Sequence, residues 1–145
     1  MTIAKTILKK TPREVIIKVT GAATDTTTLD LDGSDLTAST EVAGTAGTQV
    51  VNIAGLQWTG ANGGLITITR NSKIITQLQT GAAGALEMNG QMMVPDSQEN
   101  TSDIVVTFTN AAGELWVKLH KGDGWSTKIQ PEQYGIYDDE TSISA

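Results

Sequence analysis

The sequence predicts an all-β protein: an antiparallel two-sheet β-sandwich, jelly-roll-like, of roughly eight short strands with extended N- and C-terminal arms. Three observations predict this class. Charged residues make up only 18% of the 145 residues and glycine is abundant, a balance that favours strands and turns. Apolar and polar residues alternate in several short runs, and turn-forming residues recur about every ten residues. We assign the sandwich to residues 13–130, with arms at 1–12 and 131–145.

Most strands are placed by alternation and by flanking turn residues. Residues 2–12 end at a proline and are expected to form an arm or an edge segment. Strands are expected at 13–20, 27–31, 49–58, 65–70, 73–80, 85–89 and 91–94. We expect a bulge or bend at Gly55, and Asn71–Ser72 has the spacing of a tight hairpin turn.

The clearest pattern lies between residues 102 and 121. Ile104, Val106 and Phe108 share one face of a period-two run, and Leu115, Val117 and Leu119 share one face of the next run. The polar connection 110–113 begins with asparagine and ends with glycine. This pattern predicts an antiparallel hairpin with its apolar face in the core.

Charge and composition exclude several classes of partner. A net charge of −6 does not suit a protein that neutralises nucleic-acid phosphates, so no nucleic-acid partner is expected. The chain has no cysteine, and we find neither a signal peptide nor an apolar run long enough to span a membrane. No membrane partner is expected either.

No catalytic or metal-binding constellation is found, and we expect neither a cofactor nor enzymatic activity. Asp30, Asp32 and Asp35 resemble the start of a calcium loop, but the glutamate that closes such a loop is missing, so a solvated turn is the better interpretation. His120 is the only histidine, which excludes a histidine cluster. Glu87 and Glu114 are the acidic residues in strand context, and a glycosidase pair is a minor alternative.

The three tryptophans allow two interpretations. Trp58, Trp116 and Trp125 would form a sugar-stacking platform if they lay side by side on an open face. Tryptophan also closes the end of a sandwich core or anchors an interface. We favour a core or interface role. The exposure of the three rings distinguishes this role from a sugar-stacking platform.

Three stretches carry the chain's most distinctive strand and turn patterns: 88–96 (MNGQMMVPD), 101–106 (TSDIVV) and 114–119 (ELWVKL). In these the chain resembles small virion structural proteins of tailed bacteriophages, particularly marine ones, and the resemblance extends over most of residues 10–125. It implies a capsid decoration or cement protein, or a small neck or tail component. The implied partners are the major capsid protein, other virion subunits or further copies of the chain. The implied location is the capsid surface, after synthesis in the host cytoplasm.

The main alternative is a carbohydrate-binding or adhesive β-sandwich module. If the chain is an assembly subunit, its two arms are the expected interface, because one is basic and the other contains the acidic run 138–140. The predicted interface residues are Lys5, Lys9, Lys10, Tyr134, Ile136 and Tyr137.

Overall fold

A computed structural model describes residues 3–21, 24–87, 96, 98–110 and 112–127. These residues form eleven strands, which confirms the all-β prediction and exceeds the predicted number of strands. The strands are β1 (Ala4–Lys10), β2 (Glu14–Gly21), β3 (Asp25–Leu29), β4 (Glu41–Ala43), β5 (Val51–Gly60), β6 (Leu65–Arg70), β7 (Lys73–Gln79), β8 (Gly84–Glu87), β9 (Ile104–Thr109), β10 (Gly113–Lys121) and β11 (Trp125–Thr127).

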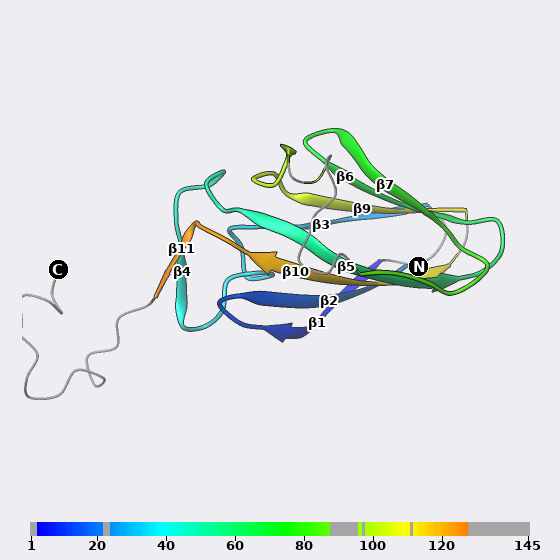
Figure 1. The fold of residues 1–145 in the computed structure, drawn as a ribbon. Helices are drawn as coiled ribbons and strands as arrows, with labels where there is room; N and C mark the ends of the chain where they lie inside the picture. The colour runs from blue at the N-terminus through cyan, green and yellow to red at the C-terminus, as the bar shows by residue number, and fades with distance from the viewer. Residues whose placement is uncertain (1–2, 22–23, 88–95, 97, 111, 128–145) are drawn as a thin grey trace, which may run out of the picture.

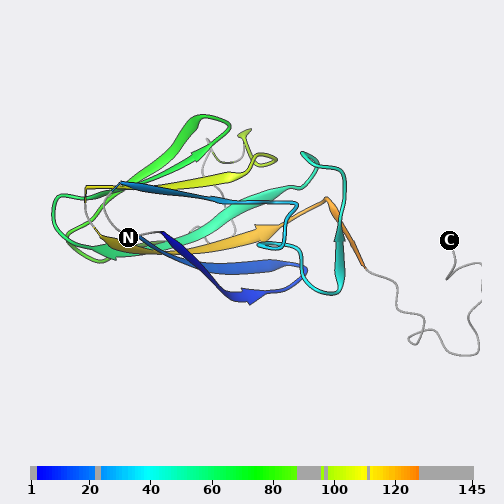
Figure 2. The same cartoon turned by 180° about the vertical axis from the view of Figure 1, so that it is seen from behind.

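Two antiparallel sheets face each other as the layers of a sandwich (Figures 1 and 2). One sheet has five strands in the order β1-β2-β10-β5-β8, and the other has four in the order β3-β9-β6-β7. A small sheet of β4 and β11 lies at one end of the sandwich (Figure 1). The two-sheet prediction is therefore confirmed.

The predicted hairpin between residues 104–109 and 115–121 is wrong. β9 pairs with β3 and β6 in the four-stranded sheet, whereas β10 pairs with β2 and β5 in the five-stranded sheet. Thr109 at the end of β9 and Gly113 at the start of β10 therefore lie in different layers. The alternation identified the buried faces correctly, because a strand of either sheet turns one face to the core. It carries no information about which strand lies alongside.

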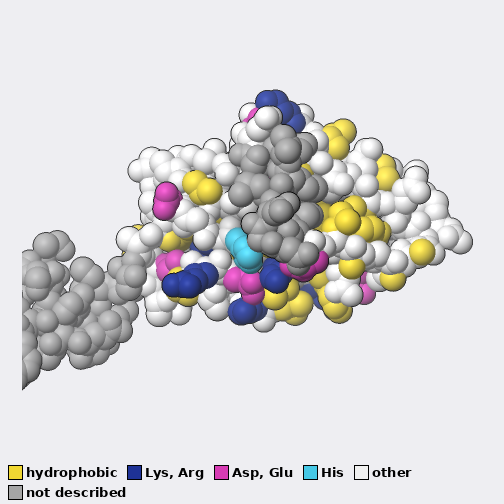
Figure 3. Space-filling view, viewed as in Figure 1, with side chains coloured by type: hydrophobic (Ala, Val, Ile, Leu, Met, Phe, Trp, Pro, Cys, Tyr) yellow, Lys and Arg dark blue, Asp and Glu magenta, His cyan; other side chains and the backbone are white. Residues whose placement is uncertain are grey.

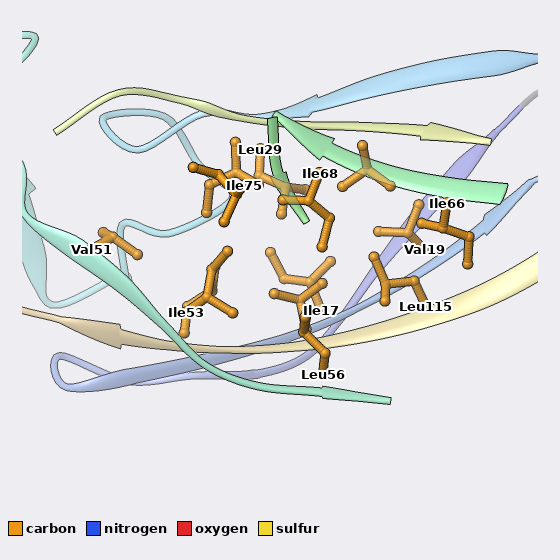
Figure 4. Packing of buried hydrophobic residues seen from close by; sticks show 14 of the residues in the cluster. Ile17, Val19, Leu29, Val51, Ile53, Leu56, Ile66, Ile68, Ile75 and Leu115 are labelled. Atoms are coloured by element: carbon orange, nitrogen blue, oxygen red, sulfur yellow. The ribbon is translucent and has the colours of Figure 1, made fainter. Parts of the chain in front are cut away.

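The core is formed where the inner faces of the two sheets meet. Ile17, Val19, Ile53 and Leu115 point from the five-stranded sheet toward the side chains of the other layer (Figure 4). The fully buried side chains of β9 and β10 are those predicted from the alternation: Ile104, Val106, Phe108, Leu115, Val117 and Leu119.

Two local predictions are confirmed by the strand register. In β5, Lys118 of β10 lies opposite Gly55 and Leu119 lies opposite Ile53, so Ala54 is the extra residue of a bulge next to Gly55. β6 and β7 form a hairpin across residues 71 and 72, both with positive φ (50° and 62°), as a type I′ turn requires.

Other expectations require correction. Residues 4–10 are an edge strand paired with β2, so the edge-segment alternative is confirmed and the assignment of 1–12 as an arm is wrong for these residues. The region 21–48, expected to be mostly loop, also contains the short strand β4. A strand of three residues is too short for an alternation of apolar and polar residues to be recognised. The predicted strand 91–94, its turn at 89–90 and the arm 131–145 lie outside the described residues.

Two buried ion pairs fasten loops to the sandwich. The Arg70 guanidinium contacts the Asp96 carboxylate at 2.7 Å, with both side chains fully buried, and it also donates to the carbonyls of Val51 and Ser102. The Asp96 carboxylate in turn accepts a hydrogen bond from the Ile53 amide. Because each polar atom has a partner, this pair ties residues 96–102 to β5 and β6.

The second pair joins β10 to the small end sheet. The Lys121 ammonium pairs with the Glu41 carboxylate, donates to the Leu36 carbonyl at 2.6 Å and lies 4.4 Å from the centroid of the Trp125 ring. Burial lowers the pKa of Lys121, and the hydrogen bond to Glu41 opposes that effect. Because its ammonium has several partners, we assign Lys121 a structural role, in which it joins β10 to the small end sheet.

Candidate functional site

The outer face of the five-stranded sheet carries the most distinctive exposed side chain of the described residues. On β10, Leu115, Val117 and Leu119 turn inward, so Trp116 and Lys118 turn outward. Trp116 is 40% exposed, a large fraction for an indole in a central strand. We call the surface around it the Trp116 face, formed by the outward residues of β2, β10, β5 and β8.

The strand register identifies the neighbours of Trp116. Lys18 of β2 lies directly opposite on one side, and Gln57 of β5 lies directly opposite on the other. Next to Gln57, β8 contributes Ala85. In the adjoining row Gly55 lies opposite Lys118. Because Ala85 and Gly55 have little or no side chain, the face is hollowed beside the indole.

Two hollows lie beside Trp116, and both include Gln57. The first has a volume of about 230 Å³ and is also lined by Trp58, Thr59, Ala83 and Glu114. The second has a volume of about 260 Å³, and its lining includes Gly55, Ala85, Glu87 and Lys118. Because Trp116 and Gln57 line both hollows, the two adjoin at these side chains, and we call the pair the trough.

The charged groups of the Trp116 face are paired across neighbouring strands. Lys18 contacts Glu114 at 3.2 Å, and Lys118 contacts Glu87 at 3.5 Å. Glu14 accepts a hydrogen bond from Lys9 at 2.9 Å. This bond is the largest of the effects that lower the pKa of Glu14, with smaller contributions from nearby positive groups. Figure 3 shows these side-chain types gathered over the five-stranded sheet.

Of the other two tryptophans, Trp58 borders the first hollow together with Trp116, whereas Trp125 lines neither hollow. Trp58 packs against the core, and its indole N–H donates to the Gln79 carbonyl at 3.1 Å. Trp125 also packs against the core and donates to the Thr37 hydroxyl at 3.2 Å. The three rings therefore do not form the platform considered from the sequence, because Trp125 lies away from the hollows. The favoured core role holds for Trp125 and in part for Trp58, and it is wrong for the exposed Trp116.

The acidic turn after β3 is explained by contacts within the chain. The Asp35 carboxylate contacts the Lys5 ammonium at 2.7 Å and accepts from the Asp30 amide. Burial, followed by the nearby Asp103 carboxylate, raises the pKa of Asp30. Among the residues that the structure describes, no group of three or more acidic or histidine side chains is placed to hold a metal ion.

His120 and Glu87, singled out from the sequence, both lie on the outer face of the five-stranded sheet. His120 follows Lys118 on the outward side of β10, and its Nε2 is 3.4 Å from the Glu14 carboxylate. Glu87 lies at the β8 end of the trough.

Within the described part of the chain there is no helix long and apolar enough to cross a membrane.

The predicted interface lysines are held by partners within the chain. Lys5 binds Asp35, Lys9 binds Glu14, and Lys10 donates to the Ser34 carbonyl at 2.7 Å. The other predicted interface residues, Tyr134, Ile136 and Tyr137, lie outside the described residues. Sequence reasoning did not single out Gln57 or Lys18. The alternation places both on an outer face, but only the strand register brings them beside Trp116.

No family model and no curated protein matches the sequence. Solved structures are similar at low identity. KdgF from Halomonas sp. is 8% identical with a TM-score of 0.36, covering 90% of this chain and 83% of that chain. A cupin superfamily protein from Desulfitobacterium hafniense is 9% identical with a TM-score of 0.36, covering 84% and 79%. The Tobacco streak virus coat protein is 8% identical with a TM-score of 0.35, covering 95% and 96%.

These similarities correct the prediction that the chain has no enzymatic activity. KdgF and a cupin superfamily protein are among the similar structures. Jelly-roll scaffolds carry unrelated functions, and activity depends on the site and not on the scaffold. The prediction of a non-enzymatic protein is therefore wrong as a conclusion from the sequence. We do not assign an enzymatic activity to the chain, and we do not exclude one.

Proposed function

We propose that this chain is a structural protein of a tailed-phage virion, a capsid decoration or cement protein that binds the outer surface of the head and stabilises it. The edge strand β1 is the observation that carries this proposal. Its residues from Ala4 to Lys9 are exposed, including Ile7 at 38% and Leu8 at 53%. Among the described strands, β1 has a partner on one side only, because it ends the five-stranded sheet.

The contacts of the lysines make this edge unusual. Edge strands are commonly protected by lysines that project into solvent and discourage pairing with other chains. Here Lys5 and Lys10 reach the turn after β3, and Lys9 turns to Glu14 of β2. Ile7 and Leu8 remain on the surface of β1. The strand register shifts between Ile7 and Lys9, which disfavours a strand added along the whole edge. The exposed apolar side chains suit a side-chain contact with a neighbouring protein.

The proposed partner is the major capsid protein or another virion subunit, and a second copy of the chain is the alternative partner. We further propose that the segment after β11 makes a second contact. It contains Tyr134, Ile136 and Tyr137, aromatic and aliphatic residues of the kind that anchor interfaces, followed by the acidic run 138–140. The protein would then be made in the host cytoplasm and located on the capsid surface.

Binding to phage heads tests the proposal. Purified chain is mixed with tailed-phage heads that lack it, and bound chain is measured after sedimentation. The wild type should sediment with heads, and Leu8→Lys should lose most of that binding because a charge enters the apolar edge. Ile74→Lys is the matched control, since Ile74 is 58% exposed on β7 of the other sheet. Equal binding by Leu8→Lys and Ile74→Lys would contradict the proposal. Binding of the wild type only to necks or tails would also contradict it.

A further inference from the structure

We propose that the trough on the Trp116 face binds a neutral glycan. A sugar ring has an apolar C–H face and a rim of hydroxyl groups, so it is suited to an exposed aromatic ring surrounded by polar side chains. Trp116 is such a ring, 40% exposed on a central strand of the sheet. This site is separate from the edge proposed to bind the capsid, because β2 lies between β1 and β10.

The shape of the trough indicates a chain of sugars and not a single ring. Trp116 and Gln57 line both hollows, so a ligand that fills both passes over the indole. The floor is low on the β5 and β8 side because the residues there are Gly55, Ala83 and Ala85. A side chain at Gly55 would meet the Glu87 carboxylate, 2.9 Å from the added Cβ. The glycine therefore keeps the hollow open, and a side chain there would displace the Glu87 carboxylate.

The polar groups around Trp116 match the needs of hydroxyl groups. The Gln57 amide provides both donors and an acceptor, and the Glu114 and Glu87 carboxylates provide acceptors at opposite ends of the trough. The Lys118 ammonium lines the second hollow as a donor. The Trp116 indole N–H is turned toward the Glu114 carboxylate at 3.4 Å, which orients the ring on the sheet.

The balance of charge indicates a neutral ligand. Three lysines and three glutamates lie on or beside the trough and contact one another: Lys9, Lys18, Lys118, Glu14, Glu87 and Glu114. His120 also faces Glu14. Because the opposite charges are paired, the face has no surplus of either sign to attract an acidic or a basic polymer.

Affinity electrophoresis and calorimetry test this inference. The full chain is run in native gels that contain a neutral polysaccharide (laminarin, galactomannan or xylan) or a charged one (alginate or chitosan). Hexasaccharides of any neutral polysaccharide that retards the chain are then titrated by calorimetry. We expect retardation by at least one neutral polysaccharide. Trp116→Ala and Gln57→Ala should each weaken the Kd about tenfold or more, because one removes the stacking surface and the other the shared amide.

Controls separate this site from the proposed capsid contact. Ile74→Ala, on the other sheet, should bind sugars like the wild type, and Trp116→Ala should still sediment with phage heads. Leu8→Lys should keep sugar binding, so that a failure of one proposal is distinguishable from a failure of the other. Retardation by none of the neutral polysaccharides, or only by a charged one, would overturn the inference. The inference would also be overturned if no sugar bound the wild type and Trp116→Ala lost head binding. That result would make the Trp116 face a protein-docking surface.

Discussion

At the scale of single residues, Phe108 shows how the two sheets are fitted together. Its ring is fully buried and lies against Gly21 and Gly113, which are paired with each other in the opposite sheet. A Cβ at Gly21 would be 3.1 Å from the Phe108 Cγ, and one at Gly113 would be 3.3 Å from its Cε2. The ring therefore fills space that two absent side chains leave open.

Replacing Phe108 with alanine should lower the free energy of unfolding by about 3–5 kcal/mol, because a large buried ring is exchanged for a cavity. The two glycines opposite have no side chains that could move into the space. Urea unfolding followed by intrinsic fluorescence measures the change. Ile74→Ala, at an exposed position, is the control and should leave the urea midpoint nearly unchanged. A midpoint unchanged in Phe108→Ala would mean that the inward face of β9 is assigned incorrectly.

The ionisation of Glu14 gives a second prediction at this scale. The hydrogen bond from Lys9 is the main cause of its lowered pKa, so the ionised carboxylate stabilises the folded state above its ordinary pKa. That contribution is lost as the pH falls through the folded-state pKa. Lys9→Met should therefore raise the pKa of Glu14 toward its ordinary value, as an NMR titration of the side-chain carboxyl would show.

The control for that titration uses a second lysine and glutamate pair. Lys73 contacts Glu99 at 2.6 Å, and a hydrogen bond from Lys73 is the main cause of the lowered pKa of Glu99. Lys73→Met should raise the pKa of Glu99 and leave that of Glu14 in place. If Lys9→Met does not move the pKa of Glu14, the Lys9 contact does not persist in solution.

At the scale of elements, alternation predicts strands and buried faces well but predicts strand partners poorly. The hairpin of β6 and β7 was predictable because the two-residue connection leaves little choice of geometry. The three-residue connection between β9 and β10 suits a hairpin and also a crossing between sheets. The same limit applies to the site. The outward position of Trp116 follows from the sequence, whereas its neighbours Lys18 and Gln57 come from strands that are distant in the chain.

The turn between β6 and β7 allows a stabilising substitution. Ser72 adopts a φ of 62°, a left-handed conformation that glycine adopts without steric cost. Ser72→Gly should raise the free energy of unfolding by about 0.5–1 kcal/mol, since asparagine followed by glycine is the preferred sequence of a type I′ turn. Thermal unfolding measures this, with Ser72→Ala as a control that should not stabilise. A lower Tm for Ser72→Gly would argue against a type I′ turn at this position.

At the scale of the whole molecule, the core of the sandwich is formed by residues from Val15 to Leu119, with Ile3, Trp58 and Trp125 packed against it. Residues 131–145 are poor in apolar side chains, so deleting them should leave the urea midpoint about the same. The deletion should weaken incorporation into phage particles, because the proposed second contact is removed. Unfolding of the shortened chain would show that the segment belongs to the core. Normal incorporation would show that it is not a contact.

Electron cryomicroscopy of intact phage particles, with and without this chain, tests the proposed function most directly. A decoration protein should appear as sandwich-shaped density on the outer surface of the head, with β1 toward the capsid and the Trp116 face accessible to solvent. That density should be missing from particles that lack the chain and from particles that carry Leu8→Lys. Density at the neck or tail, or heads that look the same with and without the chain, would contradict the capsid decoration role.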